Sequence, residues 1–142
     1  MTFGRWHRGS FSISSDPKDT DLQIVIDFLA SSYWAKHLPR EKIVQSFDNC
    51  LVYNLLDHDI DRQVGFARVV SDLHRFAYLG DVFVLERHRG QGIGAWLIKT
   101  AINDPRLANV GHWVLATTNA QPFYRKLGFE EAEPGRYMVR KD

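Results

Sequence analysis

Three glycines at alternate positions lie between a predicted strand and a predicted helix. The strand ends near Leu85, and Gly90, Gly92 and Gly94 precede apolar residues at helical spacing. The first turn of a helix carries backbone N–H groups without partners and the positive end of the helix dipole. Because glycine has no Cβ, an anion can approach this backbone closely. The pattern therefore predicts an anion-binding turn, to which Arg89 adds a positive charge.

Two common nucleotide-binding motifs do not fit this turn. Residues 90–95 match the dinucleotide pattern G-x-G-x-x-[GA], which also requires an acidic residue after the next strand. That strand is followed by Thr117-Thr118-Asn119, which contains no acid. A Walker-type loop would need glycine immediately before Lys99-Thr100, where the sequence has Ile98. The turn is therefore not expected to serve a nicotinamide enzyme or an NTPase.

The remaining pattern predicts one α/β domain that spans residues 1–142, with residues 1–8 as a loose tail. Helices are expected at residues 22–34, 41–47, 93–102 and 119–126. Strands are expected at residues 11–14, 51–56, 64–70, 76–85, 113–116, 129–130 and 136–139. An antiparallel meander followed by one crossover helix predicts a mixed, mostly antiparallel sheet flanked by helices.

Composition argues against several classes of partner. The chain has 44% apolar and 25% charged residues, which is typical of a globular protein. A formal net charge of +1 gives no support for nucleic-acid binding. No apolar run suits a signal peptide or a membrane span, so a cytoplasmic location without membrane partners is expected. Cys50 is the only cysteine, and the histidines and acids lack metal-ligand spacing, so no metal is expected.

The glycine turn and a downstream segment together resemble the GNAT superfamily of acyl-CoA-dependent N-acetyltransferases. Arg89, Gly92 and Gly94 fill that family's motif [RQ]-x-x-G-x-[GA]. Residues 120–129 are similar to its second signature, A-x-x-x-Y-x-x-x-G-F, with Tyr124 as the tyrosine. The resemblance implies the GNAT-like acyl-CoA N-acyltransferase fold with two splayed central strands. It also implies acetyl-CoA as the acetyl donor and an amine as the acceptor.

The resemblance further assigns the residues that contact acetyl-CoA. The pyrophosphate would lie on the backbone amides of the glycine turn, and the pantetheine arm would run along the preceding strand. The family often has asparagine seven residues before the tyrosine, where this chain has Thr117, with Asn119 two residues later. The residues expected to bind acetyl-CoA are Val82, Phe83, Val84, Arg89, Gly90, Gln91, Gly92, Ile93, Gly94, Ala95, Thr117 and Asn119.

Acetyl transfer to an amine needs a proton donor for the leaving thiolate and a proton acceptor for the amine. Tyr124 resembles the family's thiol-protonating tyrosine, although an aromatic residue at this helical position could also pack on the sheet. Asp81 lies on the strand before the glycine turn and is the candidate base. An ion pair between Asp81 and an arginine such as Arg68 is an equally weighted alternative.

Aromatic residues are the candidates for binding the acceptor. Tyr33 and Trp34 could line a pocket in which a cation contacts Trp34, or they could form a hydrophobic seal over the sheet. Phe76 could line the other side. A small-molecule amine and a peptide amine both remain open as acceptors, and homodimerisation is compatible with the resemblance. The main rival function is a non-catalytic acyl-CoA sensor or interaction module on the same fold.

Overall fold

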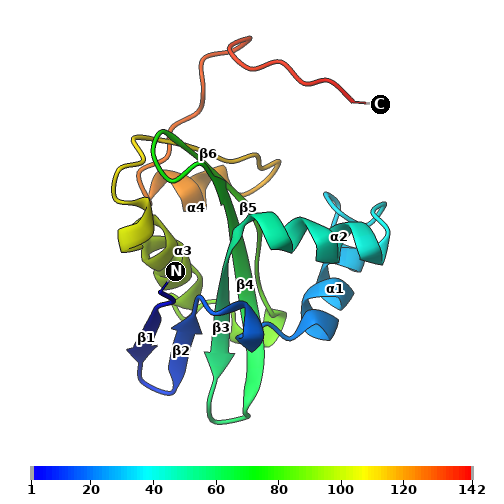
Figure 1. The fold of residues 1–142 in the computed structure, drawn as a ribbon, viewed down its shortest axis with the longest axis vertical. Helices are drawn as coiled ribbons and strands as arrows, with labels where there is room; N and C mark the ends of the chain where they lie inside the picture. The colour runs from blue at the N-terminus through cyan, green and yellow to red at the C-terminus, as the bar shows by residue number, and fades with distance from the viewer. Residues whose placement is uncertain (1, 142) are drawn as a thin grey trace.

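A six-stranded sheet organises the chain in the computed structural model, which describes residues 2–141 (Figure 1). Its strands are β1 (Arg5–Arg8), β2 (Phe11–Ser14), β3 (Leu51–Asp57), β4 (Arg62–Ser71), β5 (Phe76–Val84) and β6 (His112–Val114). The α-helices are α1 (Leu22–Ser31), α2 (Arg40–Ser46), α3 (Ile93–Ile102) and α4 (Gln121–Arg125). The strands lie in chain order, β1 to β5 pair antiparallel, and β6 pairs parallel to β5. The predicted mixed α/β sheet is therefore confirmed.

Helices cover both faces of the sheet (Figure 1). On one face, Leu29 of α1 packs in a cluster with Val52 and Phe66 of the sheet. On the other face, Leu97 of α3 belongs to a cluster with Leu55 and further sheet residues. Neighbouring positions of a strand point to opposite faces, so β3 and β4 supply both clusters. The sheet is thereby fixed between two helical layers, which hold β5 and its C-terminal end in place.

The N-terminal segment differs from the expected loose tail. Arg5–Arg8 form β1, which pairs antiparallel with β2. Gly9 and Ser10 make the two-residue connection, and Gly9 has a φ of 58°. A glycine with positive φ at the first central position suits the tight turns that join antiparallel strands. The sequence pattern did not predict this hairpin because its first strand is short and mostly polar.

The C-terminal segment also differs from expectation, since neither of the last two predicted strands forms. Residues 129–130 and 136–139 lie outside the sheet, and the chain extends away from the fold beyond α4 (Figure 1). Met138 is 95% exposed. Alternating apolar residues favour a strand only where a neighbouring backbone pairs with them. Within the part of the chain that the structure describes, no strand pairs with this segment.

Several elements end earlier than predicted. Helix α1 ends at Ser31 because Ser32 is extended and its hydroxyl accepts the Ala35 N–H at 3.1 Å. Helix α4 is limited to Gln121–Arg125, and Gly128 follows with a φ of 96°, as the predicted left-handed position requires. Strand β6 stops at Val114 rather than continuing to residue 116. This early stop opens the sheet beside β5.

Candidate active site

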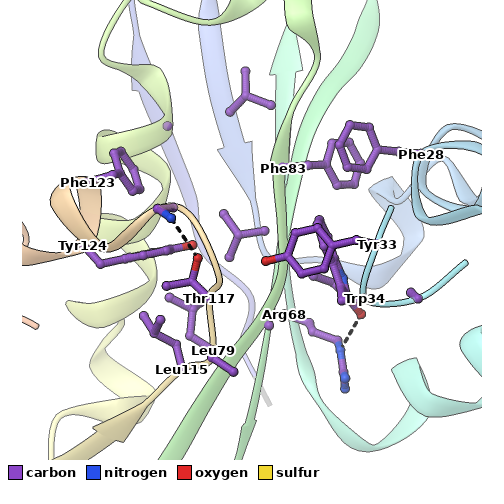
Figure 2. A pocket seen from close by; sticks show the side chains of 18 of the residues that line it. Phe28, Tyr33, Trp34, Arg68, Leu79, Phe83, Leu115, Thr117, Phe123 and Tyr124 are labelled. Carbon is purple, nitrogen blue, oxygen red and sulfur yellow. Dashed lines mark hydrogen bonds and ion pairs between the residues drawn. The ribbon is translucent and has the colours of Figure 1, made fainter. Parts of the chain in front are cut away.

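Strands β5 and β6 pair only at their beginnings and then diverge. The parallel register joins Phe76 to His112 and Tyr78 to Val114, after which β6 ends. The rest of β5 therefore faces residues 115–119 across a gap instead of a neighbouring strand. A pocket of about 1130 Å³ occupies this gap and continues toward the loop after α1 (Figure 2). The splayed central strands that the family resemblance implied are thus present.

The glycine turn forms one end of this pocket. Gly90 and Gly92 have φ values of 81° and 78°, in the left-handed region that favours glycine. Gly92 is the N-cap of α3, and no side chain caps this helix end. Gly92, Gly94 and Ala95 line the pocket. The N–H groups of the first turn of α3 and the positive end of its dipole thus lie at the pocket, where they can interact with an anion.

Arg89 holds the turn against the end of β5. Its Nε donates to the carbonyl oxygen of Val84 at 2.9 Å. The neighbouring His88 also lines the pocket, and its Nε2 lies 2.9 Å from the Asp57 carboxylate. His88 Nδ1 is buried and is the single buried side-chain nitrogen or oxygen without a hydrogen-bond partner in the described part of the chain. The hydrogen bond from Arg89 therefore ties the glycine turn to the backbone at the end of β5.

Ten of the twelve residues predicted to bind acetyl-CoA line the pocket. They are Val82, Phe83, Val84, Arg89, Gly90, Gly92, Gly94, Ala95, Thr117 and Asn119. Gln91 is exposed, and its side-chain amide donates to the His88 carbonyl. Ile93 is only 3% exposed and packs in the core beneath α3. The side chains of Gln91 and Ile93 therefore support the turn from outside the pocket.

Tyr124 projects from α4 toward the middle of the pocket, where its hydroxyl faces that of Tyr33 (Figure 2). Burial, and to a lesser degree the charge of an ionised Tyr33, raises the pKa of Tyr124 to about 12. The ring also packs edge-on against Phe129, with 5.9 Å between centroids. Tyr124 thus packs on the fold and presents a protonated hydroxyl to the pocket at neutral pH.

Tyr33 and Trp34 lie on the opposite wall of the pocket (Figure 2). The Tyr33 hydroxyl accepts the Thr118 N–H at 3.3 Å, and hydrogen bonds from Thr118 lower the pKa of Tyr33. This contact joins the loop after α1 to the loop after β6 across the pocket mouth. Thr117 also lines the wall, and its Oγ1 accepts the Ala120 N–H at 3.1 Å, which fixes the start of α4.

Asp81 lies at a bulge in β5, where its φ is 51° and the register with β4 shifts. Its Oδ2 accepts from Arg68 Nε at 2.6 Å, and its Oδ1 accepts from Trp34 Nε1 at 2.8 Å. The side chain is 11% exposed and lines the pocket. The ion pair with Arg68 that the sequence left open is therefore present, and it orients the carboxylate inside the pocket.

The structure does not bring Phe76 to the pocket, although the sequence suggested it as an acceptor contact. Phe76 begins β5 at the end far from the glycine turn and stacks on His112 with 5.8 Å between centroids. Phe28 and Phe123 line the pocket instead, and Phe28 stacks on Phe83 at 4.1 Å (Figure 2). Phe123 directly precedes Tyr124 in the second signature, and this position could have identified Phe123 as a pocket residue. Phe28 has the sequence pattern of a core residue, so no sequence signal marks it.

Neither a metal site nor a membrane span is found in the described part of the chain. Among residues 2–141, no three His, Cys, Asp or Glu side chains are grouped so that they could hold a metal ion. No helix in that range is both long and apolar enough to cross a bilayer.

Comparisons with known proteins agree with this geometry. A family model, the acetyltransferase (GNAT) domain, matches residues 48–131. A solved structure from Xanthomonas campestris pv. campestris, described as an acetyltransferase of the GNAT family, is 34% identical and covers 98% of this chain and 96% of its own, with a TM-score of 0.87. The histone acetyltransferase TAP1 of Glycine max is 33% identical over 137 residues, 87% of this chain and 56% of TAP1. Glucosamine-6-phosphate N-acetyltransferase of Arabidopsis thaliana shares the fold at 14% identity, with a TM-score of 0.64 over 92% of this chain and 99% of its own. The chain therefore belongs to the GNAT family of acetyltransferases.

Proposed function

We propose that the protein transfers the acetyl group of acetyl-CoA to a primary amine, with Tyr124 as the proton donor to the leaving thiolate. Acetyl-CoA is the general co-substrate of the GNAT family. One observation carries the proposal: a single pocket contains the start of α3 at Gly92 and Gly94, the open edge of β5, and the Tyr124 side chain. An anion site and a proton donor are thus joined by a groove lined by backbone.

The shape of the groove suits coenzyme A in three parts. The pyrophosphate fits the uncapped start of α3, where Gly92 has no Cβ and a positive φ. The amides of pantetheine can pair with the backbone of residues 80–84, since β6 ends before it reaches them. The thioester then lies in the middle of the pocket, between Tyr124 and the opposite aromatic wall.

The chemistry requires one new bond, one broken bond and two proton movements. The amine nitrogen attacks the acetyl carbon, the carbon–sulfur bond breaks, and the thiolate leaves with its electron pair. Tyr124 donates a hydrogen bond or a proton to that sulfur. Asp81 is the proposed acceptor of the amine proton, directly or through water, because each of its oxygens has a second lone pair beyond the bond to Arg68 or Trp34.

The acceptor approaches from the side of the loop after α1. Tyr33 and Trp34 form that wall, and an ammonium group can bind against the face of Trp34 before it loses its proton. The names of the relatives cover two kinds of acceptor, a histone and an amino-sugar phosphate. A panel of amines for this protein should therefore contain lysine peptides as well as small amines.

The test is acetyl-CoA consumption in the presence of such a panel. The proposal predicts that at least one primary amine causes release of free coenzyme A and yields an acetylated product by mass spectrometry in equal amount. Acetyl-CoA binding in a thermal-shift assay without turnover on any amine would instead support the non-catalytic sensor. Stabilisation by NAD or ATP rather than by coenzyme A would overturn the assignment of the pocket.

A further inference from the structure

The N-terminal hairpin packs against the segment that precedes the glycine turn and against the connection between β3 and β4. Phe11, the first residue of β2, lies edge-on to His88 with 6.2 Å between ring centroids. His88 in turn pairs with Asp57 on β3. The Ser10 carbonyl oxygen at the hairpin tip accepts the His58 N–H at 2.9 Å. The tip of the hairpin is thus fixed beside the residues that immediately precede Gly90.

Arg8 is the residue of this hairpin that reaches the start of α3. One of its terminal nitrogens, Nη2, lies 4.0 Å from where a Cβ on Gly92 would be. Its guanidinium carbon lies 6.0 Å from the ring centroid of Trp96, which holds the group over the first turn of α3. The C-terminal end of β1, where Arg8 lies, is therefore next to the start of α3 (Figure 1).

Two other basic side chains near the turn, Arg89 and His88, have hydrogen-bond partners of their own. Arg89 donates through Nε to the Val84 carbonyl, and His88 faces Asp57. Arg5, on the same strand as Arg8, is paired with Asp19 at 2.7 Å. Among residues 2–141, no carboxylate forms a salt bridge with Arg8. Arg8 therefore presents its positive charge at Gly92 without neutralisation by an acid.

We propose that Arg8 binds the pyrophosphate of coenzyme A from the side opposite β5, so that the N-terminal hairpin completes the anion site. This inference rests on the proposed use of acetyl-CoA. A planar guanidinium donates two hydrogen bonds to phosphate oxygens in a fixed geometry. The α3 N–H groups and Arg8 then hold the anion from two elements far apart in the sequence. Trp96 orients Arg8 before the ligand arrives, which reduces the loss of side-chain entropy on binding.

The test compares Arg8→Ala, Arg8→Lys and Arg5→Ala by calorimetric titration with coenzyme A and with dephospho-coenzyme A, which lacks the 3′-phosphate but keeps the pyrophosphate. Arg8→Ala is expected to weaken both ligands equally, by about 100-fold, as for two lost hydrogen bonds to a charged group. Arg8→Lys should recover part of this loss. Arg5→Ala is the matched control, since it removes the same charge from the same strand, and it should leave both affinities within about twofold.

Three results would overturn the proposal. Unchanged affinities in Arg8→Ala would remove Arg8 from the site. A loss for coenzyme A but not for dephospho-coenzyme A would assign Arg8 to the 3′-phosphate instead. An equal loss in Arg5→Ala would reveal a general effect of charge. Each of these experiments measures binding and not catalysis. If the protein binds coenzyme A but acetylates no amine, the proposed function is refuted, and the titrations still decide whether Arg8 contacts the pyrophosphate.

Discussion

Replacing Tyr124 by phenylalanine removes only the hydroxyl that we assign to the leaving thiolate. The pKa of Tyr124 is raised to about 12, chiefly by burial. The thiol of coenzyme A, taken as cysteine-like, has a pKa of about 8.5. Complete proton transfer from Tyr124 to the thiolate would therefore be uphill by about 3.5 pKa units, or roughly 5 kcal/mol. We expect Tyr124 to act mainly by a hydrogen bond that strengthens as charge develops on the sulfur.

The size of the effect follows from that hydrogen bond. A hydrogen bond to a charged group contributes about 1.5–3 kcal/mol. Tyr124→Phe should accordingly lower kcat by about 10- to 150-fold, toward the low end of the general-acid range of about 10²–10⁴. The KM for acetyl-CoA should change little, because the anion site at Gly92 is formed by another element of the fold.

Steady-state kinetics with the best acceptor of the panel would measure this loss, with Tyr137→Phe as the matched control. Tyr137→Phe also removes one tyrosine hydroxyl, but that hydroxyl lies 2.8 Å from His112 Nε2, outside the pocket that contains Tyr124. Wild-type kcat at saturating acceptor should not fall up to about pH 10, since Tyr124 stays protonated below its pKa. An unchanged kcat in Tyr124→Phe would refute the assignment, and a loss far above about 10⁴ would contradict the hydrogen-bond mechanism.

Three further predictions concern the glycine turn and the core. Gly92→Ala places a side chain at a φ of 78°, which strains the backbone by roughly 1–2 kcal/mol. Because the turn can relieve this strain only by moving away from its present geometry, acetyl-CoA binding measured by calorimetry should weaken about tenfold. Gly94→Ala meets only ordinary contacts and should bind normally, so equal losses would contradict the turn geometry. Tyr53→Phe removes a buried 2.8 Å hydrogen bond to Asp104 and should lower the free energy of unfolding in urea by about 1–3 kcal/mol, whereas an unchanged value would exclude this role. The pKa of Asp104 lies below its usual value: burial acts to raise it, but hydrogen bonds from Arg106 and Tyr53 lower it by more. The ionised Asp104 side chain therefore contributes fully to the free energy of unfolding above the pKa of the unfolded state, about 3.9, and this contribution is lost as the pH falls through the lower pKa of the folded state. Urea unfolding of Asp104→Asn as a function of pH should lack this acid-dependent loss of stability.

The parts of the site that the sequence predicted are those set by local backbone chemistry. Gly90 and Gly92 require positive φ, and such positions can be recognised from glycine spacing between a strand and a helix. Tyr124 lies in a short helix whose signature is contiguous in the sequence. The pairing of Asp81 with Arg68 is one of the two alternatives that the sequence leaves open, and in the structure the two residues lie on the neighbouring antiparallel strands β5 and β4.

The parts that it missed depend on contacts between distant segments. Arg8 reaches Gly92 only because β1 adds to the sheet edge, and four mostly polar residues give little periodic signal for a strand. Phe28 stacks on Phe83 across two elements, which no spacing within α1 reveals. The predicted strand at residues 136–139 failed for the converse reason: its alternation is present, but no strand of the described chain lies beside it.

The most direct test of where acetyl-CoA binds is the backbone amide spectrum of the ¹⁵N-labelled protein during titration with acetyl-CoA. The account predicts the largest shifts at Gly92, Gly94 and Ala95, at the start of α3, and along residues 80–84 of β5. NAD or ATP at the same concentration should leave these signals in place. Shifts confined to the groove between β6 and residues 129–137, with the start of α3 unchanged, would contradict the assignment of the pocket.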